Sequence, residues 1–140
     1  VYQNINNGVY RAGFASSQAA YDEAVQAVFE TLDRLDRHLA VSRYLAGDSL
    51  TEADWRLFPT LARFDVAYFG AFRCNLQRLT DYEHLWPYTR ELYQQPGVAD
   101  TIDFDTFKRG YYSASKERNP HGIVPAGPEI DFSEPHGRGD

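Results

Sequence analysis

Three tyrosines are the residues of this sequence whose type and placement could do chemistry together. Tyr10 precedes the first expected helix, Tyr68 lies near the end of the second, and Tyr111 lies in the last short helix. A tyrosine hydroxyl has an ordinary pKa near 10, so at neutral pH it is a hydrogen-bond donor or a weak acid. If the three phenols meet at one end of a helical bundle, they can bind an oxygen-bearing aromatic ligand.

The same tyrosines have a purely structural interpretation. The sequence contains 10 Tyr and 9 Phe, and 15% of its residues are aromatic. Because tyrosine joins an apolar ring to a hydroxyl, this content indicates amphipathic surfaces at a pocket or an interface. Most of the tyrosines are expected simply to edge the core. Their positions in the sequence do not by themselves establish that Tyr10, Tyr68 and Tyr111 converge.

Cys74 is the only cysteine, and two interpretations compete for it. The neighbouring Arg73 and Arg78 could lower its pKa and make it a nucleophile. A lone cysteine in an apolar-rich segment is more often a small buried hydrophobic residue, and we favour that interpretation. One cysteine cannot form an internal disulfide, so a reducing cytoplasm is the simplest location.

Other catalytic patterns are absent from the sequence. The histidines show no ligand spacing with one another or with Cys74, so no metal site is expected. No Gly-rich phosphate loop precedes a helix, and no GxSxG turn marks a nucleophilic serine. Asp103 and Asp105 are expected to cap a helix rather than to act as acid and base. The histidines in question are His38, His84, His121 and His136.

Length and charge narrow the class of protein. The 140 residues, 43% of them hydrophobic, suffice for one domain with a core. The net charge is −6 and the 14 Lys and Arg are dispersed, so no nucleic-acid partner is expected. The longest apolar stretch, around residues 66–72, is far too short to span a membrane. Because the sequence begins with Val and contains no Met, we expect it to be a piece of a longer polypeptide.

Helical spacing organises the first part of the chain. Residues 1–15 lack periodicity and contain Asn6-Asn7-Gly8, a turn signal, so they are predicted to form a loop. Ser16 or Ser17 can cap an amphipathic helix that runs to about Leu39. In the segment SLTEADW, Thr51 and Asp54 have the spacing of a capping box at the start of a second helix.

The second helix is predicted to reach Tyr68 and to be the most buried one, although Pro59 interrupts its hydrogen bonds. A third helix is predicted over 85–94, and two short helical turns over 98–102 and 106–112, the latter with Asp105 as a cap. Several prolines exclude helix from the rest. We therefore expect a loop over 1–15, a helical domain over 16–112 and an extended Pro-rich tail over 113–140.

Five segments together resemble one family, the glutathionyl-hydroquinone reductases, also called Xi-class glutathione transferases. The resemblance covers nearly the whole chain and weakens only after about Pro128. Its most specific parts are the first segment and the end of the last; the Thr51–Asp54 capping box is shared by glutathione transferases generally. The segments are NNGVYRAGFA, RYLAGDSLTEADWRLFPTLARFD, FRCNL, LWPYTRELYQQPGV and KRGYYSASKERNPHGIVPAGP.

The resemblance implies an all-α fold, namely the helical bundle of a glutathione transferase C-terminal domain with the extended tail. In the family, a thioredoxin-like N-terminal domain binds most of the co-substrate glutathione and carries the nucleophilic cysteine. The helical domain forms a wall for a quinone-derived aromatic substrate. The enzymes use glutathione to remove the glutathionyl group from glutathionyl-hydroquinones, yielding hydroquinone and glutathione disulfide. They are homodimers, and no metal is involved.

Carried over to this sequence, the resemblance assigns substrate binding to Tyr10 in GVYRAG, Tyr68 in RFDVAYFGAF and Tyr111 in KRGYY. It assigns no catalytic residue here, because Cys74 matches a cysteine of the helical domain and not the nucleophile. The chain alone is therefore expected to be inactive. Many members carry His where this sequence has residues 69–71 and Gly110, which puts the substrate preference in doubt. The alternative function is a non-catalytic helical module for dimerisation or protein association.

Overall fold

The computed structural model describes residues 2–139, leaving out the terminal residues of the predicted loop and tail, and the side chains of residues 2 and 3. Within this range the chain is helical and no strand forms, which confirms the predicted all-α class; Tyr44 and Gly47 make an isolated bridge. None of the helices in the described range is long and apolar enough to cross a membrane. The elements are η1 (Tyr2–Asn6), α1 (Asn7–Gly13), α2 (Gln18–Leu39), α3 (Glu52–Arg63), η2 (Phe64–Tyr68), α4 (Phe69–Ala71), η3 (Leu79–Asp81), α5 (Leu85–Tyr93), η4 (Ala99–Thr101) and α6 (Phe104–Ser113).

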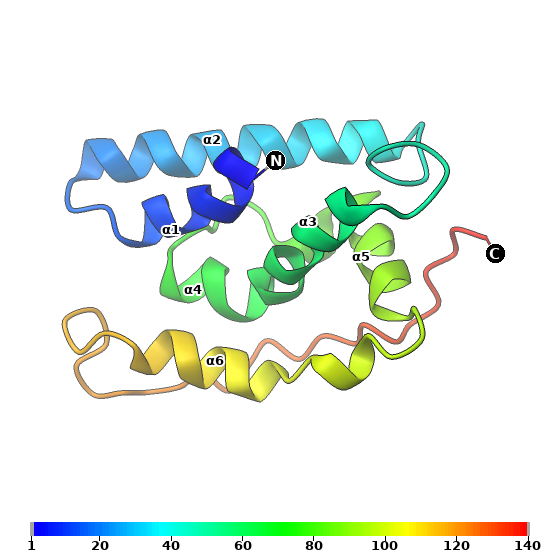
Figure 1. The fold of residues 1–140 in the computed structure, drawn as a ribbon. Coiled ribbons are helices and arrows are strands. Elements are labelled where there is room, and N and C mark those ends of the chain that lie inside the picture. The colour runs from blue at the N-terminus through cyan, green and yellow to red at the C-terminus, as the bar shows by residue number, and fades with distance from the viewer. Residues whose placement is uncertain (1, 140) are drawn as a thin grey trace.

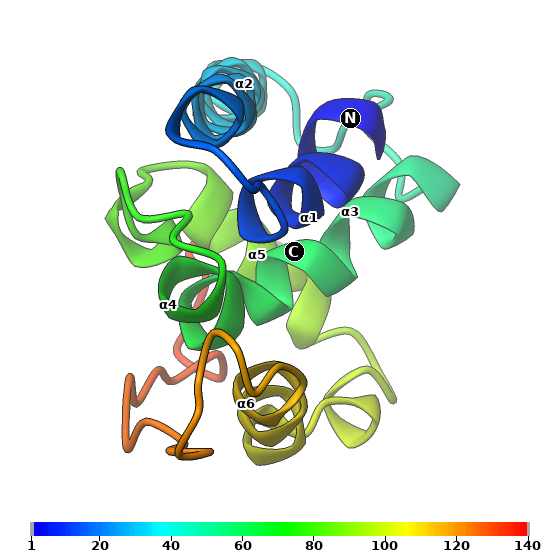
Figure 2. The same cartoon turned by 90° about the vertical axis from the view of Figure 1, so that its left-hand side faces the viewer.

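The helices form a bundle around the segment that runs from α3 through η2 to α4. The long α2 lies on one side of this segment, with α1 packed against α2, and α6 lies on the opposite side (Figure 1). Turning the molecule shows α1, α4 and the end of α6 together at one end (Figure 2). Residues that are far apart in the sequence therefore meet at this end.

The predicted first helix is confirmed as α2, whose 22 residues run from Gln18 to Leu39. Ser17 is its N-cap, and the Ser17 hydroxyl accepts a hydrogen bond from the Ala20 backbone N–H at 3.1 Å. The buried residues recur at intervals of three and four and form one face of the helix. They are Ala24, Val25, Val28, Phe29, Thr31, Leu32 and Leu39.

The predicted loop over 1–15 is wrong, because residues 2–13 are helical. Ile5, Val9 and Ala12 recur at helical spacing and are fully buried. Burial of this short apolar stripe against α2 and α3 stabilises a helix that the turn-forming residues Asn6 and Gly8 disfavour locally. Tertiary packing here overrides local propensity.

The Asp54 carboxylate joins three parts of the chain while being completely buried. The Thr51 backbone N–H donates to it at 2.9 Å, which completes a capping box at the start of α3. Its other oxygen accepts from the Leu45 backbone N–H at 3.0 Å and from the Tyr88 hydroxyl at 2.7 Å. The loop before α3, the start of α3 and helix α5 thus share one acceptor.

The segment after α3 widens into a π-helical turn at η2. All five of its residues are buried, as expected for the central helix. Asp65 in this turn accepts hydrogen bonds from the backbone N–H groups of Leu79, at 2.7 Å, and Thr80, at 3.2 Å. Burial raises the pKa of Asp65. The carboxylate thereby fixes η3 against the middle of the bundle.

Carboxylates also accept hydrogen bonds from the backbone at the starts of α5 and α6. Asp36 of α2 accepts from the backbone N–H groups of His84 and Leu85, at 2.9 and 2.8 Å, where α5 starts. Asp103 is the N-cap of α6 and accepts from the Thr106 N–H at 3.1 Å. The expectation that Asp105 is this cap is wrong; Asp105 lies inside the first turn, where its carboxylate pairs with an exposed arginine one turn later.

The tail beyond α6 contains no helix in the described range and runs back along the bundle towards α5 (Figure 1). Phe132 anchors it, being only 3% exposed. Its ring centroid lies 4.8 Å from that of Phe104, 5.0 Å from that of Trp86 and 5.4 Å from that of Tyr93. The tail therefore extends the core instead of merely covering the surface.

A buried carboxylate holds the end of the tail. Glu91 of α5 is 2% exposed and pairs with the guanidinium groups of Arg43, at 3.1 Å, and Arg138, at 2.9 Å. The Tyr44 hydroxyl donates to its other oxygen. Arg43 also donates to the carbonyl oxygen of Gly139 at 2.8 Å. Because two cations compensate the buried charge, the end of the tail is fixed to α5.

Replacing Asp54 by Ala is expected to lower the free energy of unfolding by about 3 kcal/mol, because one buried and two partly buried donors lose their acceptor. Urea denaturation followed by far-UV circular dichroism measures this. The control is Glu52→Ala on the same helix, whose exposed pair with Arg56 is worth less than about 1 kcal/mol. Equal losses in the two variants would contradict the role assigned to Asp54.

Replacing Phe132 by Ala is expected to lower the free energy of unfolding by about 3 kcal/mol, since a buried aromatic side chain leaves a cavity. The matched control is Ile123→Ala in the same tail, where the side chain is 67% exposed and the expected change is below about 0.5 kcal/mol. A negligible effect of Phe132→Ala would show that the tail does not unfold together with the helical domain. The predicted division of the chain at residue 113 implies such independence.

Candidate functional site

The three sequence-predicted tyrosines do meet at one end of the bundle. The hydroxyl oxygens of Tyr10 and Tyr111 are 2.6 Å apart, those of Tyr68 and Tyr111 are 2.9 Å apart, and those of Tyr10 and Tyr68 are 3.4 Å apart. Tyr68 is 2% exposed, whereas Tyr10 is 40% exposed. The tyrosine cluster, as we call these three residues, therefore extends from the buried core to the surface.

Two phenylalanines complete the aromatic surroundings. Phe14 follows Tyr10 by four residues and Phe72 follows Tyr68 by four, so each pair lies on one helical face. The rings of Tyr10 and Phe14 stack with centroids 6.3 Å apart, and those of Tyr68 and Phe72 with centroids 5.3 Å apart. Phe72 also lies edge-on to Tyr111 at 5.5 Å. The phenol hydroxyls thus sit within an apolar, aromatic wall.

Local backbone features bring the tyrosines together. Tyr10 is carried by α1, Tyr68 ends the π-helical turn, and Tyr111 is on α6. Gly13 lets α1 approach closely, because a Cβ at this position would lie 2.4 Å from the Phe72 ring. The chain thus combines a widened helical turn with a close helix approach at the site.

The environment keeps the buried hydroxyls protonated. Burial raises the pKa of Tyr68 strongly, and its hydrogen bonds with Tyr10 and Tyr111 add to the shift. Burial is also the largest cause of the raised pKa of Tyr111. These two phenols therefore stay neutral across the physiological pH range and can donate hydrogen bonds to a carbonyl, phenol or phenolate oxygen.

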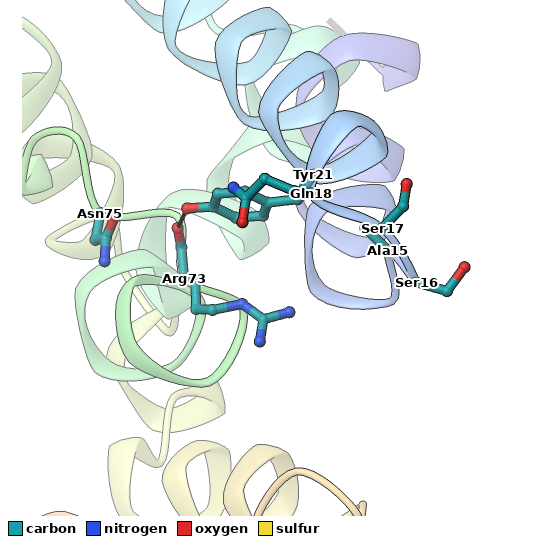
Figure 3. Close-up of a pocket in the computed structure, with 7 residues that line it drawn as sticks. All are labelled: Ala15, Ser16, Ser17, Gln18, Tyr21, Arg73 and Asn75. Carbon is teal, nitrogen blue, oxygen red and sulfur yellow. Dashed lines mark hydrogen bonds between the residues drawn. The ribbon is translucent and has the colours of Figure 1, made fainter.

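A cleft of about 590 Å³ opens beside the tyrosine cluster, and Tyr111 is part of its wall. A second hollow, of about 410 Å³, adjoins the start of α2. There the Tyr21 hydroxyl donates to the backbone carbonyl of Arg73 (Figure 3). Arg73 lines both hollows.

Gly70 and Gly110 differ in what an added side chain would meet. A Cβ at Gly70 would lie 1.8 Å from the hydroxyl oxygen of Tyr112, so no larger residue fits here unless Tyr112 moves. At Gly110 no heavy atom lies within 4 Å of a built Cβ, so a larger side chain is tolerated there. The position of Tyr112 at the cleft therefore depends on Gly70.

Cys74 has the character of a structural residue. It is completely buried, and burial raises the pKa of its thiol to about 12 despite the adjacent Arg73. A neutral, inaccessible thiol is a poor nucleophile.

Across residues 2–139, no group of three or more His, Cys, Asp or Glu side chains is placed to hold a metal ion.

Comparison with known proteins identifies the family. Residues 18–91 match the family described as "Glutathione S-transferase, C-terminal domain". The chain therefore belongs to the glutathione S-transferase family and corresponds to its C-terminal helical domain. The bundle type predicted from the sequence is confirmed by the solved structures that it resembles.

Individual relatives refine this assignment. The chain is 51% identical to glutathionyl-hydroquinone reductase YqjG of Escherichia coli (strain K12) over 99% of this chain and 42% of the relative. It is 52% identical to glutathionyl-hydroquinone reductase PcpF of Sphingobium chlorophenolicum over 91% of this chain and 41% of the relative. It thus spans about two fifths of the length of these relatives.

Solved structures agree with these relatives. The glutathione-bound structure of YqjG superimposes with a TM-score of 0.95 at 52% identity, covering 98% of this chain and 45% of that one. A Xi-class transferase from Natrialba magadii superimposes with a TM-score of 0.94 at 52% identity, covering 96% and 41% of the two chains. The resemblance to the Xi class that the sequence motifs indicate is confirmed.

Sequence reasoning missed Phe14, Phe72, Tyr112 and Arg118 as neighbours of the site. Phe14 follows Tyr10 by four residues, a spacing that places two side chains on the same face of a helix. Because residues 1–15 were predicted to be a loop, this spacing did not indicate that the two rings are neighbours. Arg118 lies in the polar tail, where no periodicity indicates which way a side chain points.

Cys74 is expected to resist modification in the folded protein. With a thiol pKa of about 12, roughly one molecule in ten thousand carries the thiolate at pH 8. We expect Ellman's reagent at pH 8 to react at least about 100-fold more slowly with native protein than with protein unfolded in guanidinium chloride. Because a raised pKa keeps the thiol protonated, the native rate should increase with pH. Rapid stoichiometric reaction at pH 8 would contradict this assignment.

Proposed function

We propose that this chain is the substrate-binding helical part of a glutathione-dependent reductase. The whole enzyme removes glutathione from glutathionyl-hydroquinones and releases hydroquinone and glutathione disulfide. The convergence of the Tyr10, Tyr68 and Tyr111 hydroxyls in an aromatic, partly open setting carries this proposal. The names of the relatives support the reaction class.

The tyrosines are proposed to bind the aromatic substrate through its ring oxygens. When the carbon–sulfur bond of the substrate breaks, the ring carbon must gain a proton and charge develops on the ring oxygens. Neutral phenols stabilise such charge by donating hydrogen bonds to the oxygens on which it develops. Tyr10, the most exposed of the three, is placed to meet the ligand first.

The thiol chemistry is proposed to reside outside these residues. The chain spans about two fifths of its relatives, and its single cysteine is buried with a raised pKa. We propose that a thioredoxin-like N-terminal domain supplies the nucleophilic cysteine and most of the glutathione site. The glutathione named in the solved YqjG structure is consistent with this co-substrate. Homodimer formation, a cytoplasmic location and the inactivity of this chain alone stay predictions.

The test is turnover of a glutathionyl-hydroquinone by the full-length protein and by this chain alone. Only the full-length protein should be active, and Tyr68→Phe or Tyr111→Phe should each lower its kcat/KM about tenfold or more by removing a donor to developing charge. The control is Tyr93→Phe, since this ring packs on Phe104 and Phe132 in another cluster.

Two outcomes would contradict the proposal. Absence of turnover by the full-length protein would favour a non-catalytic module for dimerisation or protein association. Full activity in the Tyr68→Phe and Tyr111→Phe variants would separate the tyrosine cluster from the substrate site even if the enzyme is active.

A further inference from the structure

The cleft beside the tyrosine cluster has a polar, charged lining that the proposed reaction does not use. Its wall comes from α4, from the end of α6 and from the following loop, which lie together at the end of the bundle seen in Figure 2. Tyr111 belongs to both the cluster and the cleft, so the cleft adjoins the cluster. The lining residues are Gly70, Ala71, Arg73, Tyr111, Tyr112, Ser115, Glu117, Arg118, Asn119 and Ile123.

The charged groups of the cleft carry a net positive charge. Two arginines, Arg73 and Arg118, line it together with one acidic residue, Glu117. The whole chain has a net charge of −6, so a cationic cleft is a local reversal of the overall sign. A cleft of this kind attracts an anion more strongly than the surrounding surface does.

Arg118 is held in place by the same aromatic wall as the tyrosines. Its guanidinium donates to the carbonyl oxygen of Gly13 at 2.6 Å and lies 4.2 Å from the ring centroid of Phe14. It also lies 5.6 Å from the ring centroid of Phe72. Since a guanidinium has five N–H donors in a planar fork, an Arg118 fixed by one hydrogen bond and two rings keeps donors for a ligand.

Arg73 is the second arginine in the wall of the cleft. Its backbone has a φ of 58°, in the left-handed region that non-glycine residues seldom occupy, and its carbonyl oxygen accepts from the Tyr21 hydroxyl. The guanidinium carbon lies 5.6 Å from the Tyr21 ring centroid, and Figure 3 shows both side chains at the hollow beside the start of α2. Arg73 thus adds a second arginine to the wall of the cleft.

We propose that Arg118 and Arg73 bind an anionic substituent, a carboxylate in particular, on the aromatic ring that the tyrosine cluster holds. This inference rests on the proposed function and narrows its substrate class to hydroquinones that carry an acidic group. The planar guanidinium group of an arginine can donate two parallel hydrogen bonds to one carboxylate. The guanidinium group of Arg118 is already oriented by its contact with the Phe14 ring. Glutathione also contains carboxylates, so the test must separate the two sources.

A matched pair of ligands tests the inference by direct binding. Calorimetry on the full-length protein compares 2,5-dihydroxybenzoate with hydroquinone, which differ by one carboxylate and contain no glutathione. We expect the carboxylate to improve the dissociation constant about tenfold, as for a charge-assisted pair that remains partly exposed to water. Raising the salt concentration should reduce this preference.

Two variants assign the preference to the cleft. Arg118→Gln should bring the ratio of the two dissociation constants close to one, and Arg73→Gln should reduce it. Arg118→Gln also removes the hydrogen bond to Gly13 and can disturb the loop after α6. Arg73→Gln keeps that bond, so it tests the inference independently. The control is Arg56→Gln, which removes a charge of the same sign at the far end of α3, where Arg56 pairs with Glu52; the ratio should stay about tenfold.

Turnover separates the failure of this inference from failure of the proposed function. Glutathionyl conjugates of the same two rings are compared in wild type and in Arg118→Gln, and the charged conjugate should lose its advantage in kcat/KM. If both conjugates lose activity equally, the arginines serve glutathione and the inference is overturned. If wild type binds the two rings equally, it is also overturned. If neither conjugate is turned over, the proposed function fails, while the binding ratio still decides whether the cleft selects anions.

Discussion

The Asp54 carboxylate is the point at which local and tertiary structure are joined. It completes the cap of α3 through Thr51 and, from the same buried position, accepts hydrogen bonds from Leu45 and from Tyr88 on α5. Burial and this hydrogen bond raise the pKa of Tyr88, which keeps the phenol protonated as the donor. Because the direction of α3 determines where η2 and α4 lie, the position of Tyr68 depends on a carboxylate in a different part of the bundle.

The candidate site is built where separate elements end, and no single element contains it. Tyr10, Tyr68 and Tyr111 come from α1, η2 and α6, and their hydroxyls are among the contacts that join these elements at this end. The tail adds Arg118, whose contacts with Gly13 and Phe14 connect it to α1. Under the proposed function, ligand binding would involve the same atoms as tertiary packing, and a ligand that bridges the hydroxyls would also stabilise the arrangement of the helices.

The sequence predicts those features that depend on short-range spacing. The course of α2, its Ser17 cap and the Thr51–Asp54 capping box follow from periodicity and from capping residues. The helix over 7–13 was missed because Asn6 and Gly8 disfavour it locally, while its stabilisation comes from distant contacts. The meeting of the tyrosines likewise depends on packing between segments about a hundred residues apart, which no local pattern encodes. Residue type and placement single out these three tyrosines, and the family resemblance supplies their assignment to a substrate site.

The π-helical turn at η2 has a consequence for insertions and deletions. Each residue of a regular helix advances the direction of the side chain by about 100°. The Phe69 N–H bonds to the carbonyl of Phe64, five residues earlier, so the turn contains one residue more than a regular helix would. A homologue that lost one residue between Pro59 and Tyr68 could keep a regular helix and every residue type, and yet direct this tyrosine away from its two partners. Alignment gaps in this segment therefore carry more information about the site than substitutions do.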